Sequence, residues 1–180
     1  MVRRRRARAL APGHPGLAPH HFSVLTFGIY LDDTGPEQGP LTALPGTHRG
    51  TLFDQFDADG RWTGAVAARD VATLRTDTAV DLCGPAGTVV LLDCRVVHGS
   101  AANYSSRLRP LLLNVYSAAD ALPITPAPTP TSRTGVLVRG AEPTHVHMEP
   151  YLGRLPPRWD QIGYRSIFAA QTAARPAEVD

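Results

Sequence analysis

Short β-type runs separated by glycine and proline constrain this chain more than any other feature. Of its 180 residues, 16 are glycine and 17 are proline. Proline interrupts helices and central strands, and glycine favours turns, so the pattern leaves little room for long helices. The runs rich in β-branched and aromatic residues are 22–33, 41–44, 79–82, 88–98 and 109–117. They predict strands, with helices only near 65–75 and 162–174, and a mainly β sandwich or jelly roll.

The charge pattern gives no reason to expect a nucleic-acid or membrane partner. All 18 basic residues are arginine, and five of them lie between Arg3 and Arg8. Away from that run the chain is mildly acidic, and no apolar run approaches the roughly 20 residues that cross a bilayer. The two cysteines, Cys83 and Cys94, are too few for a disulfide framework, and we expect both to be small buried side chains. The sequence therefore predicts a cytoplasmic protein.

The run 88–98 has one uncharged and one charged face. If it is a single strand, the uncharged face holds Val90, Leu92, Cys94, Val96 and His98. Asp93 and Arg95 share the other face with Val97, so that face is predicted to meet solvent. His98 then ends the strand with its imidazole facing the interior, where a lone histidine can equally be a structural residue.

An arginine opens the next run on its apolar face. Arg109 shares this face with Leu111, Leu113 and Val115. A guanidinium at the edge of an apolar interior is costly unless an anion meets it. The sequence therefore predicts a carboxylate or phosphate beside Arg109. This anion is either a ligand or a protein carboxylate such as that of Asp93 or Asp32.

The segment from His98 to Pro110 resembles the H-G-S-x-x-N-x-S-x-x-x-R-P signature of the phytanoyl-CoA dioxygenase family. The matching residues are His98, Gly99, Ser100, Asn103, Ser105, Arg109 and Pro110. A second block, residues 30–50 (YLDD...GPL..LPGTHRG), is similar to the family's stretch before that signature, with the same order and spacing. The family comprises iron(II)- and 2-oxoglutarate-dependent oxygenases. The resemblance implies their double-stranded β-helix, a cupin-like jelly roll, here incomplete at the N-terminus.

The resemblance also implies a role for three of these residues. His98 would be the distal histidine of the 2-His-1-carboxylate triad that binds Fe(II). Arg109 would pair with the distal carboxylate of 2-oxoglutarate, helped by the Ser100 hydroxyl. With both cofactors and O2, the family hydroxylates small-molecule substrates, and no catalytic side chain beyond the metal ligand is implied. Phe53, Phe56 and Trp62 are candidates to line the substrate site.

The two remaining iron ligands of the family come as H-x-D, and the chain contains no such motif. His14, His20 and His21 precede the first matching strand, but no acidic residue follows two positions after any of them. The segment His147-Met148-Glu149 has the H-x-acid pattern, yet it comes after the core strands. It could offer two neighbouring metal ligands or simply be a polar tail strand.

The opening of the chain suggests a reason for this absence. Counting back from Pro19-His20 puts the family's histidine at Pro12 and its aspartate at His14. His-Gln-Asp codons read in another frame would give the Pro12-Gly13 found here. We therefore expect residues 1–17 to be a disordered or off-frame segment, residues 18–118 the β-helix core, and residues 119–180 a Pro-rich arm and C-terminal tail packing on that core.

Three functions remain open at this stage. The first is an Fe(II)- and 2-oxoglutarate-dependent dioxygenase of a small metabolite, inactive as this chain because two of its three iron ligands are missing. The second is a non-catalytic, dicarboxylate-binding pseudoenzyme of the same fold. The third is a cupin-like metal protein that uses His98 with another histidine. A β-helix without its early strands is also expected to expose unpaired strand edges.

Overall fold

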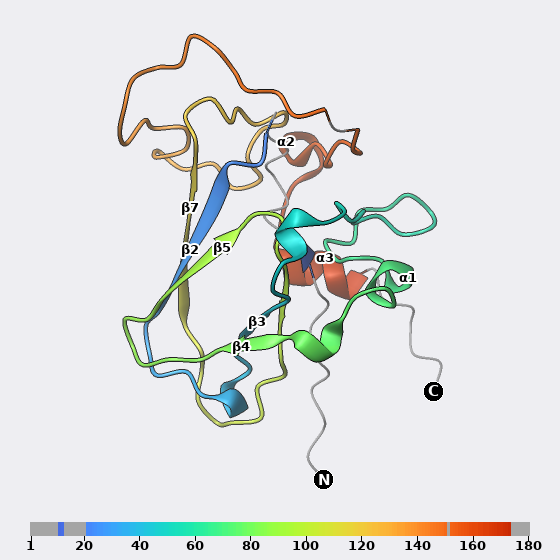
Figure 1. The fold of residues 1–180 in the computed structure, drawn as a ribbon, viewed down its shortest axis with the longest axis vertical. Coiled ribbons are helices and arrows are strands. Elements are labelled where there is room, and N and C mark those ends of the chain that lie inside the picture. The colour runs from blue at the N-terminus through green and yellow to red at the C-terminus, as the bar shows by residue number, and fades with distance from the viewer. Residues whose placement is uncertain (1–10, 13–20, 151, 174–180) are drawn as a thin grey trace.

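Two antiparallel sheets form the centre of the computed structural model, which describes residues 11–12, 21–150 and 152–173 (Figure 1). The first sheet has the order β5-β2-β7 and consists of β2 (Val24–Tyr30), β5 (Val89–Asp93) and β7 (Leu111–Ser117). The second has the order β1-β6-β3-β4 and consists of β1 (Ala11–Pro12), β3 (Leu41–Ala43), β4 (Val80–Leu82) and β6 (Val97–Ser100). This confirms the predicted mainly β architecture.

The helices in the described residues are short and peripheral. They are α1 (Ala68–Val71), α2 (Trp159–Ile162), α3 (Ile167–Ala173) and three 3-10 turns at Pro36–Gln38, Thr47–Arg49 and Thr76–Thr78. Helices α1 and α3 lie where the sequence predicts helices. No helix in the described part of the chain is long and apolar enough to cross a membrane.

The main core fills the space between the two sheets. Its buried residues are Tyr30, Leu41, Ala43, Val90, Leu92 and Val96. Tyr30 is fully buried, and its hydroxyl donates a hydrogen bond to the Leu82 carbonyl (2.6 Å) and accepts one from the Leu41 amide (3.4 Å). One phenol thus ties β2 to both β3 and β4, since a buried tyrosine hydroxyl needs polar partners.

The run 88–98 is two strands in different sheets, so the prediction of one continuous strand is wrong. Strand β5 ends at Asp93, and the chain turns before β6 begins at Val97. The Asp93 carboxylate accepts a hydrogen bond from the Arg95 amide (2.8 Å), and the Asp93 carbonyl accepts one from the Val96 amide (3.1 Å). After this Asx-type turn, the alternation of inward-facing and outward-facing side chains begins anew. Val97, predicted to face solvent, is therefore fully buried, in a second cluster with Leu44 and Val66.

Cys83 is exposed, which corrects the prediction that both thiols are buried. It follows β4, the edge strand of its sheet, and the first two residues of β4 are also exposed. Cys94 is half-buried in the turn between β5 and β6. Its thiol lies 3.4 Å from the Phe22 carbonyl.

The chain beyond β7 first runs as an arm without a helix or named strand. This arm, residues 118–150, lies over one end of the β5-β2-β7 sheet and is largely exposed (Figure 1). The Asp120 carboxylate accepts a hydrogen bond from the His147 amide (3.2 Å), and Glu149 accepts one from the Phe22 amide (3.3 Å). The arm is thereby fixed to the start of β2.

The C-terminal residues contact the loop before α1. Gln171 donates a hydrogen bond to the Gly64 carbonyl (3.0 Å), and the rings of Trp62 and Trp159 meet edge to face at 5.0 Å. Within the predicted N-terminal segment, only Ala11–Pro12 is described, as strand β1. Residues 1–10 and 13–17 lie outside the described residues.

Candidate functional site

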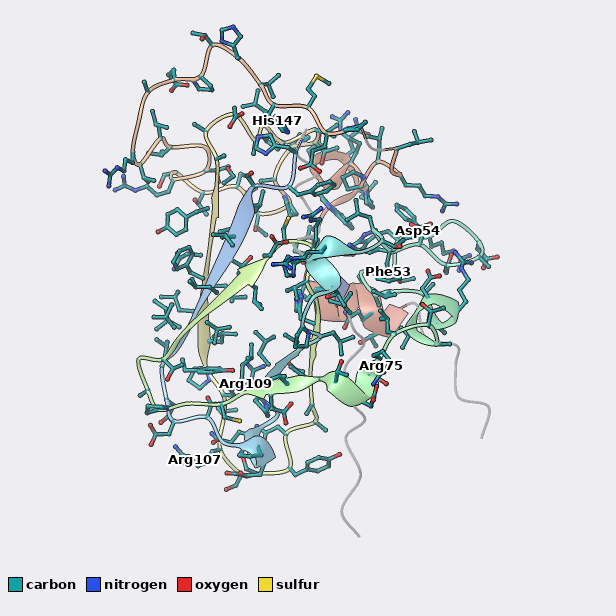
Figure 2. The ribbon with its side chains drawn as sticks, viewed as in Figure 1. Phe53, Asp54, Arg75, Arg107, Arg109 and His147 are labelled. Atoms are coloured by element: carbon teal, nitrogen blue, oxygen red, sulfur yellow. The ribbon has the colours of Figure 1, made fainter. Side chains whose placement is uncertain are left out.

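Strand β6 and the start of β7 bring the predicted cofactor residues together. His98 and Ser100 are two residues apart on β6, so their side chains lie on the same face of the strand. Arg109 precedes β7, and its Nη2 donates a hydrogen bond to the Ser100 hydroxyl (3.2 Å). Figure 2 shows Arg109 near the lower end of β7. The contact therefore joins an element of each sheet at the edge of the space between them.

The His98 imidazole is held in one orientation by the backbone. Its Nδ1 lies 2.9 Å from the Val96 carbonyl oxygen. A carbonyl can only accept, so Nδ1 carries the proton of the neutral ring and Nε2 keeps its lone pair. Burial lowers the pKa of His98, and the bond to the Val96 carbonyl offsets this only in part. The ring is therefore neutral at pH 7, the form in which histidine binds a metal.

The other polar residues of the signature shape the loop between Ser100 and Arg109. The Asn103 side-chain oxygen accepts hydrogen bonds from the Ser105 amide (2.9 Å) and the Ser105 hydroxyl (2.8 Å). The Asn103 side-chain nitrogen donates to the Arg107 carbonyl (2.8 Å). Asn and Ser suit such local turns because their short side chains bond to nearby backbone. They position Arg109 through the backbone.

Gln38 and Gly39 support this loop, and the sequence assigned them only to a turn. Gln38 is 2% exposed, accepts a hydrogen bond from the Gly35 amide (2.8 Å) and donates one to the Leu108 carbonyl (3.4 Å). Gly39 has φ +67, and a Cβ there would lie 2.5 Å from the Ala101 carbonyl oxygen. Only glycine allows this approach. The sequence signal for Gly39 was its place between two prolines of a predicted turn. Its close approach to Ala101, far along the chain, could not be predicted from that signal.

The two protein carboxylates predicted as possible partners of Arg109 lie beside other arginines. Asp32 forms an exposed ion pair with Arg107 (3.2 Å). Asp93 lies 3.9 Å from Arg95. Both carboxylates thus lie beside an arginine other than Arg109.

The described residues do not fit a complete iron triad. No group of three His, Cys, Asp or Glu residues among them is placed to hold a metal ion. In β1, Ala11 is paired with His98 and Pro12 with Val97, and neither alanine nor proline has a ligating side chain. His14 and His20 lie outside the described residues. His98 is therefore the single ligand that the described part of this site offers.

The H-x-acid segment of the tail lies at a different place. The His147 ring packs edge to face on the His21 ring at 5.5 Å. Nε2 of the buried His21 lies 3.3 Å from the Asp120 carboxylate. This cluster ties the arm to the start of β2. It does not support the prediction of a metal pair at His147 and Glu149.

The aromatic residues suggested for the substrate site have protein partners. Phe53 packs against the cluster around Val97, Phe56 lies beneath the Arg154 guanidinium (5.2 Å), and Trp62 contacts Trp159. In Figure 2, Phe53 lies beside α3, well away from Arg109. Their role toward a substrate stays a prediction.

A family model described as "Phytanoyl-CoA dioxygenase (PhyH)" matches residues 6–111, more than half of the 180 residues. This chain belongs to the phytanoyl-CoA dioxygenase family. The match confirms the resemblance read from the His98–Pro110 signature.

The curated relatives of this chain include dioxygenases that are named for small molecules. A probable alpha-ketoglutarate-dependent hypophosphite dioxygenase of Stutzerimonas stutzeri is 38% identical over 114 residues, covering 59% of this chain and 38% of that protein. The ectoine dioxygenase of Stutzerimonas stutzeri (strain A1501) is 31% identical over 106 residues, covering 53% of this chain and 35% of that protein. The chain thus spans little more than a third of the length of these relatives.

Solved structures confirm the predicted jelly-roll fold of the family. The apo form of EctD from S. alaskensis matches with a TM-score of 0.55 and 26% identity, over 67% of this chain and 42% of that chain. The non-heme alpha-ketoglutarate-dependent carbocyclase SnoK matches with a TM-score of 0.50 and 29% identity, over 66% of this chain and 46% of that chain. EctD with 2-oxoglutarate and 5-hydroxyectoine, at 24% identity and a TM-score of 0.55, shows the same fold.

Proposed function

We propose that this protein is an Fe(II)- and 2-oxoglutarate-dependent dioxygenase of a small metabolite, and that this chain supplies the 2-oxoglutarate site and one iron ligand. The contact of Arg109 with Ser100, on the strand that carries His98, is the observation behind this proposal. Membership of the family and the dioxygenase names of its relatives support it.

Arg109 and Ser100 form a carboxylate-binding pair. The planar guanidinium can donate two parallel hydrogen bonds to one carboxylate, and such charge-assisted bonds are stronger than neutral ones. Because Arg109 donates to the Ser100 oxygen, the hydroxyl proton of Ser100 can be donated to the same ligand. Arg109 is half-buried, so its charge is shielded less from the ligand than on an open surface.

Bound iron would activate O2 in this family, but the described residues offer it His98 alone. The described residues therefore account for binding of 2-oxoglutarate and for one iron ligand, but not for turnover. The relatives act on hypophosphite, ectoine and, for an enzyme 28% identical to this chain, L-proline. These names support a small polar substrate. Both described cysteines are free, which supports a reducing, cytoplasmic location.

Binding of 2-oxoglutarate to the purified chain tests the proposal. Isothermal titration calorimetry would compare wild type with Arg109→Ala and with Arg107→Ala. Arg107 is the matched control because it is exposed and already pairs with Asp32. We expect Arg109→Ala to weaken binding at least about tenfold, the loss of a hydrogen bond to a charged group. Arg107→Ala should leave it unchanged. Equal affinity in all three proteins would overturn the assignment of Arg109.

The second candidate is a dicarboxylate-binding pseudoenzyme, favoured by the incomplete triad among the described residues. Fe(II)-dependent release of succinate from 2-oxoglutarate separates it from the first. Release equal to that of a protein-free iron control supports the pseudoenzyme. Release that His98→Ala abolishes shows that residues outside the described ranges complete the iron site. Metal binding that survives Arg109→Ala but not His98→Ala, without release of succinate, would instead support the cupin-like alternative.

A further inference from the structure

The loop between Ser100 and Arg109 rests on the turn at residues 35–40. The Glu37 carbonyl accepts hydrogen bonds from two amides of the loop, those of Tyr104 (2.8 Å) and Ser105 (3.2 Å). Figure 1 shows the short helix of this turn in blue at the lower end of the molecule. The path of the chain from β6 to Arg109 is therefore set partly by a segment about 70 residues earlier.

Gln38 lies inside this turn, and both ends of its side-chain amide are bonded. Its oxygen accepts from the Gly35 amide (2.8 Å), and its nitrogen donates to the Leu108 carbonyl (3.4 Å). A backbone amide can only donate and a carbonyl can only accept, so the two bonds fix which way round the side-chain amide lies. Gln38 is only 2% exposed, so water cannot readily replace either bond.

The Leu108 carbonyl belongs to the peptide group that joins Leu108 to Arg109. A peptide group is planar, so a bond to this carbonyl also restricts the Arg109 N–H and the φ angle of Arg109. On the other side, Pro110 restricts the ψ angle of Arg109 to the extended region. The Pro110 carbonyl in turn accepts a hydrogen bond from the Leu31 amide (3.2 Å). Together the two flanking peptide groups set the direction in which the Arg109 side chain leaves the backbone.

The side chains just before Arg109 do little to hold this peptide group. Leu108 is 82% exposed, although it is a large apolar residue. Arg107 is also exposed, and its guanidinium pairs with Asp32 at the surface. The bond from Gln38 to the backbone therefore supplies order that packing does not supply here.

We propose that Gln38 is a positioning residue for the 2-oxoglutarate site: its amide holds the peptide group before Arg109 and so directs the guanidinium to Ser100 and the ligand. A guanidinium makes two parallel bonds to a carboxylate only in a narrow range of orientations, so a rotation of the Arg109 backbone weakens binding. This inference rests on the proposed function, because it requires that Arg109 binds a carboxylate.

Titration calorimetry with 2-oxoglutarate tests the inference on wild type, Gln38→Met and Thr63→Val. Methionine has a similar length to glutamine but can make neither bond. Thr63→Val is the control, since the Thr63 hydroxyl bonds to the backbone of Gln55 and Ala65 in the loop before α1. Both variants lose hydrogen bonds to the backbone, but only one of them lies in the turn that holds Leu108. Urea denaturation checks that each variant is folded.

Gln38→Glu gives a readout that a general loss of stability would not change. Its carboxyl can still accept from the Gly35 amide, but it can donate to the Leu108 carbonyl only when it is protonated. Titrations at about pH 8.5 and about pH 6 therefore compare the variant without and with this bond, since burial shifts a carboxyl pKa upward. We expect the ratio of its Kd to that of wild type to be smaller at the lower pH.

We expect Gln38→Met to raise the Kd about fivefold, the loss of one hydrogen bond, and Thr63→Val to leave it unchanged. The inference is overturned by an unchanged Kd in Gln38→Met, by an equal loss in Thr63→Val, or by a Gln38→Glu ratio that is the same at both pH values. If Gln38→Met does not fold, the pH dependence of Gln38→Glu decides. Wild-type binding that Arg109→Ala weakens keeps the proposed function in all of these cases, whereas a wild type that does not bind 2-oxoglutarate overturns both.

Discussion

The Arg109 guanidinium, two residues before β7, donates a hydrogen bond to the hydroxyl of Ser100, the last residue of β6, across 3.2 Å. Strand β6 belongs to the second sheet and strand β7 to the first. The pair that we propose to bind a carboxylate is therefore assembled only when both sheets are formed. Loss of either partner should affect ligand binding more than folding, because neither side chain is fully buried.

Replacing Ser100 with alanine should weaken 2-oxoglutarate binding to a smaller degree than replacing Arg109. A neutral hydroxyl contributes about 1 kcal/mol, roughly a fivefold change in Kd, and less than a charged group. Ser100→Thr keeps the hydroxyl and is the matched control. Titration calorimetry of the two variants checks this expectation. If alanine and threonine bind the ligand equally well, the hydroxyl has no part in the site.

Replacing Gly39 with alanine should destabilise the fold strongly. Gly39 has φ +67, and the new Cβ would lie 2.5 Å from the Ala101 carbonyl oxygen, in the loop that leads to Arg109. We expect a loss of about 2–4 kcal/mol in the free energy of unfolding, from backbone strain and steric overlap together. Gly46→Ala is the control, because Gly46 has φ +83 but nothing within 4 Å. It should cost only about 1 kcal/mol. Urea denaturation that ranks the two variants equally would contradict the role of the close approach.

The sequence allowed the site to be predicted further than the fold around it. His98, Ser100 and Arg109 lie in one spaced signature. The contact of Arg109 with Ser100 needs only that β6 and β7 follow each other in the chain. The role of Gln38 was not predictable, because its bond to the Leu108 carbonyl spans 70 residues.

The break between β5 and β6 was missed for a different reason. Apolar residues continue on both sides of it, so the run 88–98 keeps the pattern of one strand. The turn depends on the bond from the Asp93 carboxylate to the Arg95 amide. Hydrophobic alternation carries no information on such a bond, since it reports only which side chains are apolar.

The stability of the fold should fall as the pH is lowered, with His98 contributing part of the fall. Burial lowers the folded-state pKa of His98 below its ordinary value of 6.5, so protonation favours the unfolded chain. Its contribution is fully present above pH 6.5 and is lost as the pH falls toward the folded-state pKa. His98→Gln cannot take up this proton. The urea midpoint should therefore drop less in the variant than in wild type between about pH 7.5 and about pH 5, an interval that includes the ordinary histidine pKa. Parallel pH curves would exclude His98 as a contributor.

The two thiols should differ in their rate of alkylation. Burial raises the pKa of Cys94 to about 11, and its thiol contacts the Phe22 carbonyl. Cys83 is exposed, and burial raises its pKa above the ordinary 9.0 by less than it raises the pKa of Cys94. The thiolate is the reactive form, so at pH 8 we expect Cys83 to react with iodoacetamide at least about tenfold faster than Cys94. Peptide mass spectrometry over time measures both sites in one sample. Denaturation in urea is the control, because it should bring the two rates together. Equal rates in the folded protein would mean that the turn between β5 and β6 opens as readily as the edge after β4.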